Sequence, residues 1–233
     1  MKLIVLTFFA LFGSINGACP ANLEADVVFV VDTSTAVDKA SYESIANTLV
    51  ETFGSCKISA HGVSTTGVRI AIINTPGDDW GTPLVVSSFS TITSTRILKQ
   101  ALENTFPDPL YDPVQASGQM LLSQALQTVN RTDFINNGYR DGGNHVIIYI
   151  TTTSSPDARA LEAAQKIRTS NTYGFLAISY KGNGVNTEAL NQFVGGKSCI
   201  LSANNENDLS VLGVQLINLI NQASQNGGNY NCQ

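Results

Sequence analysis

Short runs of consecutive apolar residues alternate with segments of helical periodicity along the chain. The runs at 27–31 and 146–150 are apolar or aromatic at every position, which is typical of strands buried on both faces of a sheet. Shorter runs predict further strands at 68–73, 84–86, 175–179 and 199–201. Apolar residues at helical spacing predict helices at 41–53, 93–104, 120–129, 157–168, 187–193 and 208–223.

This alternation predicts a single α/β domain. Strands that are apolar on both faces belong in a parallel sheet, and the helices between them must cover both of its faces. We therefore expect a doubly wound, mostly parallel six-stranded sheet, with the short strand at 84–86 antiparallel at one edge. In such a sheet, ligand sites lie at the carboxyl ends of the strands.

The first seventeen residues have the layout of a signal peptide. Met1 and Lys2 precede an apolar segment at 3–12, and small residues follow at 13–18. This apolar stretch is shorter than the roughly 20 residues that a membrane-spanning helix needs, so we expect no membrane insertion. We expect residues 1–17 to be removed on secretion, although Ala18 would also be an acceptable last residue, and residues 18–233 to form the domain.

All four cysteines follow the expected signal peptide. They are Cys19, Cys56, Cys199 and Cys232. An even number of cysteines in an oxidising compartment predicts two disulfides. A zinc site is the weaker alternative, because no two cysteines are closely spaced and the chain has only two histidines. The tripeptide that begins at Asn130 reads Asn-Arg-Thr and is an acceptor for N-linked glycosylation.

Charge and motifs exclude several classes of function. The chain carries a net charge of −5 and has no basic tract, which argues against nucleic acid or anionic membranes as partners. It contains no nucleophile elbow, dinucleotide fingerprint or phosphate loop, so we expect neither an enzyme nor a cofactor. The alternative is a secreted α/β hydrolase-type enzyme, which would have to use His61 or His145.

The end of the first predicted strand carries the most informative motif. Asp32 closes the apolar run and is followed two residues later by the hydroxyl of Ser34. This motif and the succession of elements resemble the von Willebrand factor type A domain over almost all of residues 18–233. The resemblance is strongest to secreted nematode members of that family, some of which are joined to C-type lectin domains. It implies a Rossmann-like fold and an extracellular adhesion or interaction module.

The resemblance also implies a degenerate metal-ion-dependent adhesion site. In the family, a D-x-S-x-S loop, a threonine and a second aspartate bind a divalent ion, usually magnesium, through hard oxygen ligands. Here Asp32 and Ser34 match the first two positions, whereas Ala36, Met120 and Thr152 stand at or near the other three. We therefore expect Asp32 and Ser34 to be vestigial metal ligands, with at most weak magnesium binding.

Two further expectations follow from the resemblance. The loops at 32–37, 107–116 and 151–156 would bind an extracellular protein or glycan. The two chain ends lie close together in this fold class, on the side opposite those loops. This favours a Cys19–Cys232 bridge, which leaves Cys56 with Cys199. The alternative joins neighbours in sequence, Cys19 with Cys56 and Cys199 with Cys232.

Overall fold

The structure is a computed structural model of the 233-residue chain. It describes residues 19–76, 83–106, 120–131, 134 and 136–233. The expected signal peptide at 1–17 and the expected binding loop at 107–116 lie outside these residues. Among the described helices, none is long and apolar enough to cross a membrane.

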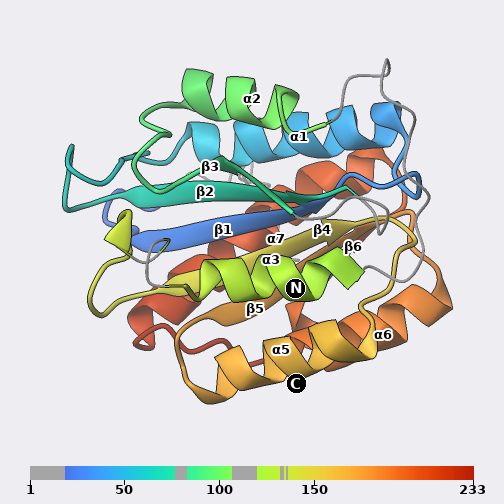
Figure 1. The fold of residues 1–233 in the computed structure, drawn as a ribbon. Helices are drawn as coiled ribbons and strands as arrows, with labels where there is room; N and C mark the ends of the chain where they lie inside the picture. Colours follow the sequence, from blue (N-terminus) through green and yellow to red (C-terminus); the bar gives the residue numbers. More distant parts are fainter. Residues whose placement is uncertain (1–18, 77–82, 107–119, 132–133, 135) are drawn as a thin grey trace, which may run out of the picture.

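The core of the fold is a six-stranded sheet with the order β3-β2-β1-β4-β5-β6 (Figure 1). The strands are β1 (Ala25–Asp32), β2 (Val68–Thr75), β3 (Leu84–Ser87), β4 (His145–Thr151), β5 (Gly174–Tyr180) and β6 (Ile200–Ala203). All pairs are parallel except β2 with β3, which is antiparallel and forms one edge. The predicted fold class and the predicted antiparallel edge strand are confirmed.

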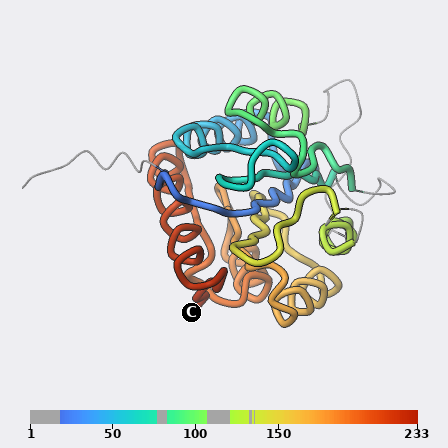
Figure 2. The backbone as a smooth tube through the Cα atoms, turned by 90° about the vertical axis from the view of Figure 1, so that its left-hand side faces the viewer, coloured from blue at the N-terminus to red at the C-terminus, as the bar shows by residue number. Residues whose placement is uncertain are grey.

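Helices cover both faces of the sheet. They are α1 (Lys39–Gly54), α2 (Thr95–Glu103), α3 (Met120–Val129), α5 (Ala158–Thr169), α6 (Gly184–Val194) and α7 (Glu206–Gln225). On one face α1 packs against α7 and α2, and on the other face α5 packs against α3 and α6. Figure 2 shows the two groups on opposite sides of the sheet. This arrangement explains the apolar runs in the sequence, because every residue of β1, β2 and β4 is buried.

Polar side chains fix the starts of several helices. Asp38, Ser94 and Asp157 each accept a hydrogen bond from a backbone N–H of the first turn, which leaves fewer unpaired donors there. The predicted start of the helix at 157 is one residue early, because Asp157 is the cap and the helix begins at Ala158.

The two disulfides join neighbours in sequence, so our preferred pairing is wrong. Cys19 pairs with Cys56 and Cys199 pairs with Cys232, at Cα–Cα distances of 4.9 and 5.1 Å. The backbone N–H of Cys19 also donates to Ser55 Oγ at 3.0 Å, which places the start of the domain against the end of α1.

Strand order explains this pairing. Cys19 precedes β1 and Cys199 directly precedes β6, and β4 and β5 lie between those strands. At about 4.8 Å per strand, the amino ends of β1 and β6 are about 14 Å apart, whereas a disulfide tolerates only about 4.4–6.8 Å between Cα atoms. Cys56 precedes β2, which is one strand farther from β6. A Cys56–Cys199 bridge would therefore have to span four strand spacings. Cys232 Sγ lies 3.8 Å from the carbonyl oxygen of Phe175 on β5, so a Cys19–Cys232 bridge would have to cross β4.

Candidate functional site at the carboxyl edge of the sheet

Asp32 and Ser34 lie where the sequence predicts, at the carboxyl end of β1. Both are almost completely buried, with exposed fractions of 1% and 2%. The Ser34 backbone N–H donates to Asp32 Oδ1 at 3.0 Å, and the backbone N–H of Ala36 donates to Ser34 Oγ at 3.3 Å. These bonds fold the loop after β1 back onto its own side chains.

The end of β4 contributes two threonines to the same place. Thr151 Oγ1 donates to Asp32 Oδ2 at 3.0 Å, so both oxygens of that carboxylate accept a hydrogen bond from the protein. Thr152, which we expect at the position of the family's second acid, donates through Oγ1 to the carbonyl oxygen of Ala36 at 2.5 Å. The loops after β1 and β4 are thus tied together by hydroxyl groups.

A further residue, which the sequence analysis missed, extends this network to β5. Asn186 on α6 is fully buried; its Nδ2 donates to the carbonyl oxygen of Ser154, and its Oδ1 accepts from Ser179 Oγ at 2.9 Å. Gly182 packs so closely that a Cβ there would lie 2.1 Å from Ser179 Oγ. Asn186 precedes the helix predicted at 187–193, so no sequence pattern indicated that it would be buried. We call Asp32, Thr151, Ser154, Asn186 and Ser179 the carboxyl-edge network.

Opposite charges lie on the outer side of this network. The Asp38 carboxylate accepts from the backbone N–H and the hydroxyl of Ser41, at 2.9 and 2.7 Å. These hydrogen bonds hold the pKa of Asp38 below its ordinary value, and the nearby Lys181 adds a smaller effect in the same direction. Lys181 Nζ lies 3.3 Å from Ser41 Oγ and 4.8 Å from the centre of the Tyr180 ring. Asp38 and Lys181 thus place opposite charges on either side of Ser41.

The donor set falls short of a magnesium site. Asp32 and Ser34 offer one carboxylate and one hydroxyl, Ala36 offers no side-chain ligand, and the Thr152 hydroxyl is directed at a carbonyl oxygen. In the part of the chain that the structure describes, no group of three or more His, Cys, Asp or Glu side chains could hold a metal ion. Magnesium requires nearly octahedral oxygen coordination and gives up its waters reluctantly, so this set does not fit it. Residue 119 and the side chain of Met120 lie outside the part of the chain that the structure describes.

The opposite, amino edge of the sheet holds a buried charged cluster. Arg69, Asp26 and His145 occupy paired positions on the adjacent strands β2, β1 and β4. Arg140 Nε lies 2.9 Å from Asp26 Oδ1, and the Arg140 backbone N–H donates to Asp26 Oδ2, also at 2.9 Å. Burial lowers the pKa of Arg140, and the Asp26 carboxylate opposes that shift. His145 Nε2 lies 3.4 Å from Asp26 Oδ2, and its ring stacks on Tyr139.

Both histidines lie away from the carboxyl-edge network. His145 begins β4 and is buried in the charged cluster, whereas His61 is exposed in the connection between α1 and β2. A hydrolytic site that used either residue would therefore lie at the amino edge, and Asp32 and Ser34 would take no part in it.

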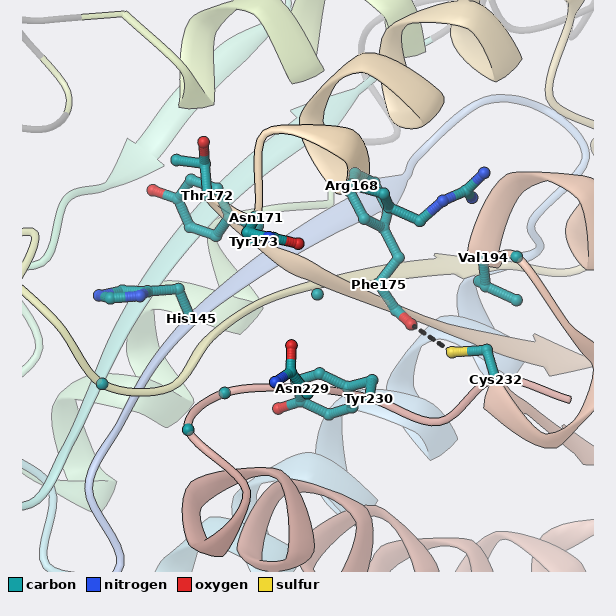
Figure 3. A pocket seen from close by; sticks show the side chains of 15 residues that line it. His145, Arg168, Asn171, Thr172, Tyr173, Phe175, Val194, Asn229, Tyr230 and Cys232 are labelled. Atoms are coloured by element: carbon teal, nitrogen blue, oxygen red, sulfur yellow. Dashed lines mark hydrogen bonds between the residues drawn. The ribbon is translucent and has the colours of Figure 1, made fainter.

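A cavity of about 380 Å³ also lies at the amino edge, between the start of β5 and the C-terminal tail (Figure 3). Tyr230 forms one wall, so close to the backbone of Gly174 that a Cβ there would meet its ring at 2.1 Å. The Tyr230 hydroxyl donates to Asn144 Oδ1 at 2.8 Å, and Cys232 Sγ lies 3.8 Å from the carbonyl oxygen of Phe175. These contacts attach the tail to the sheet beside the second disulfide.

Comparison with known families identifies the class of protein that this fold defines. The model of the von Willebrand factor type A domain matches residues 26–214. The chain therefore belongs to the von Willebrand factor type A domain family, as its motif and element order predicted.

One curated relative is Protein irg-7 of Caenorhabditis elegans. It is 32% identical to this chain over 208 residues, which cover 88% of this chain and 9% of that protein. The chain thus spans less than a tenth of its relative's length.

Solved structures show the same fold at lower identity. Proximal thread matrix protein 1 from the mussel byssus, with a zinc-occupied MIDAS motif, has a TM-score of 0.67 and 16% identity, covering 88% of this chain and 49% of that chain. The manganese-loaded TRAP protein of Plasmodium vivax has a TM-score of 0.57 and 16% identity, covering 83% and 73%.

Proposed function

We propose that the chain is a secreted, non-enzymatic interaction module that binds an extracellular protein or glycan at the carboxyl edge of its sheet, without tight binding of a divalent metal. Membership of the family supports the role as an interaction module, because von Willebrand factor type A domains mediate protein interactions. The carboxyl-edge network supports a site without a tightly bound metal, because hydroxyl and amide groups of the protein join the loops that a metal ion would otherwise join.

The cysteines and the start of the chain support secretion. Structural disulfides are typical of oxidising compartments and rare in the cytosol, and residues 1–17 have the composition of a signal peptide. Asn130 is exposed directly after α3, where a glycan could be attached. A purified secreted chain that begins at residue 18 or 19 would support this part of the proposal.

Titration calorimetry with magnesium and manganese tests the metal-free site. We expect no binding with a dissociation constant below about 1 mM, the weak end of extracellular cation sites. The combined substitutions Ala36→Ser, Met120→Thr and Thr152→Asp should create measurable affinity, because they restore the family's three missing oxygen ligands. A submillimolar constant for the unchanged chain would contradict the proposal.

A paired set of surface variants tests the binding face. Thr35 and Thr153 are exposed in the loops after β1 and β4, so Thr35→Arg with Thr153→Arg should abolish capture of the partner from the organism's extracellular fluid. Thr65→Arg changes an exposed threonine near the amino edge and should leave capture unchanged. Unchanged capture by the double variant, or loss with Thr65→Arg alone, would place the binding face elsewhere.

A further inference from the structure

A groove of about 440 Å³ lies between α3 and α5, on the outer side of the helices that cover one face of the sheet. Figures 1 and 2 both show these helices side by side, and they are in contact. The floor is apolar and buried, formed largely by Leu126 and Ile167, with the small side chain of Ala163 between the walls. The volume falls within the range of about 300–1,000 Å³ that small-ligand sites occupy.

The walls of this groove carry exposed polar side chains. Gln124 and Gln127 project from α3, and Arg159, Glu162 and Lys166 project from α5. Lys166 Nζ lies 2.7 Å from Glu162 Oε1, which lowers the pKa of Glu162. Together the walls offer amide, guanidinium, ammonium and carboxylate groups above an apolar floor. A sugar ring, with hydroxyl groups at its rim and C–H groups on its faces, fits this chemistry.

Asn130 places a sugar acceptor at the end of the same groove. Its backbone N–H donates to the carbonyl oxygen of Leu126 at 3.3 Å, and that of Arg131 donates to the carbonyl oxygen of Thr128 at 3.1 Å. The acceptor therefore has a defined position at the end of α3, and its exposed side chain lines the groove. A glycan attached there would begin inside the groove.

We propose that the groove between α3 and α5 is the seat of the N-linked glycan of Asn130, and that the first N-acetylglucosamine units pack on its floor and bond to its walls. This rests on the proposed secretion of the chain. The attachment keeps the sugar at an effective concentration of about millimolar, so weak individual contacts are sufficient for occupancy. The groove is then filled by the chain's own glycan, which leaves the carboxyl edge for the partner.

The rate at which Lys166 is acylated reports whether the sugar occupies the groove, because a sugar there would cover this lysine. The full chain is produced in a eukaryotic secretory host, alongside Asn130→Gln, and intact mass shows whether a glycan is present. The acylation rate of Lys166 is then compared with the rates of Lys39 and Lys99, because each of the three pairs with a glutamate four residues away. The side chain of Lys166 is 75% exposed, that of Lys39 64% and that of Lys99 56%. We expect Lys166 to react about threefold more slowly in the glycosylated chain, as for a seat occupied about two thirds of the time, with the controls unchanged.

Ala163→Arg separates seating from attachment. The longer side chain fills the groove, so the glycan should remain by mass while the protection of Lys166 disappears. If the glycan is present but Lys166 reacts equally with and without it, the glycan does not occupy the groove. That result would leave the proposed secretion and the proposed binding face unaffected. If the secreted chain shows no glycan by mass, both the modification and the seat are wrong. If the host does not secrete the chain, the proposed secretion is contradicted, and with it the glycan.

Discussion

The two edges of the sheet are held together by different kinds of interaction. At the carboxyl edge, one buried carboxylate, Asp32, is surrounded by hydroxyl and amide groups. At the amino edge lie a buried ion pair and both disulfides. The strong crosslinks of the described residues are thus concentrated opposite the candidate site. The amino edge holds the ends of the strands by crosslinks, whereas hydrogen bonds hold the loops at the candidate site.

The largest effect is expected from breaking the ion pair at the amino edge. Arg140→Ala removes the guanidinium that lies 2.9 Å from Asp26, which is 1% exposed. Arg69 and His145 remain as neighbours of Asp26 in the charged cluster. Removing one partner of a buried pair costs about 3–5 kcal/mol of unfolding free energy. Chemical denaturation measures this loss. Glu24→Ala is the control, because Glu24 is half exposed and lies 3.9 Å from Arg140, and it should cost below about 1 kcal/mol. Equal losses in the two variants would mean that the buried ion pair stabilises the fold no more than the exposed contact with Glu24.

Removing either disulfide is expected to have the next largest effect. The pairs Cys19→Ser with Cys56→Ser and Cys199→Ser with Cys232→Ser open loops of 37 and 33 residues. The chain-entropy model gives a loss of about 3–4 kcal/mol for each. Peptide mapping without reduction should first show the two pairings between sequence neighbours. A linked peptide that contains Cys19 and Cys232 would contradict this arrangement of the amino edge.

The difference between the edges also explains what the sequence could predict. The apolar runs at 27–31 and 146–150 gave the parallel sheet, because a strand buried on both faces must be apolar at nearly every position. Asp32 and Ser34 could be placed because the carboxyl end of a strand follows directly from its run.

The remaining features depend on which strands are neighbours. Arg69, Asp26 and His145 meet because β2, β1 and β4 adopt one register, which no local pattern encodes. The disulfide pairing depends on strand order in the same way. Asn186 joins the carboxyl-edge network only after α6 packs on β5, and it lies just before the helix predicted at 187–193, so the local sequence did not indicate its role.

A moderate effect is expected from opening the carboxyl-edge network. Thr151→Val keeps the shape of the side chain but removes the hydroxyl that donates to Asp32 Oδ2. A buried acceptor that loses its donor costs about 1–3 kcal/mol, and Asp32 then also accepts one bond fewer from the protein. Thr153→Val is the matched control, because Thr153 is exposed, and it should change stability by less than about 0.5 kcal/mol. A loss as large as that for Arg140→Ala would mean that the two edges are equally strongly held.

The smallest effect is expected from the exposed charge at the start of α1. Asp38→Ala removes the cap and should cost about 1 kcal/mol at pH 6, whereas Asp38→Asn keeps an oxygen that accepts from Ser41 and should cost only about 0.3–1 kcal/mol. The pKa of Asp38 is lower in the folded protein than in the unfolded chain because Ser41 bonds to the charged form. The stability that this charge contributes is therefore complete above the ordinary aspartate pKa, and it is lost as pH falls through the lower folded value. Denaturation curves of the wild-type chain and Asp38→Asn should differ at pH 6 and converge in strong acid. A constant difference between the curves would show that the charge of Asp38 contributes nothing, and that the carboxyl edge depends on its hydrogen bonds alone.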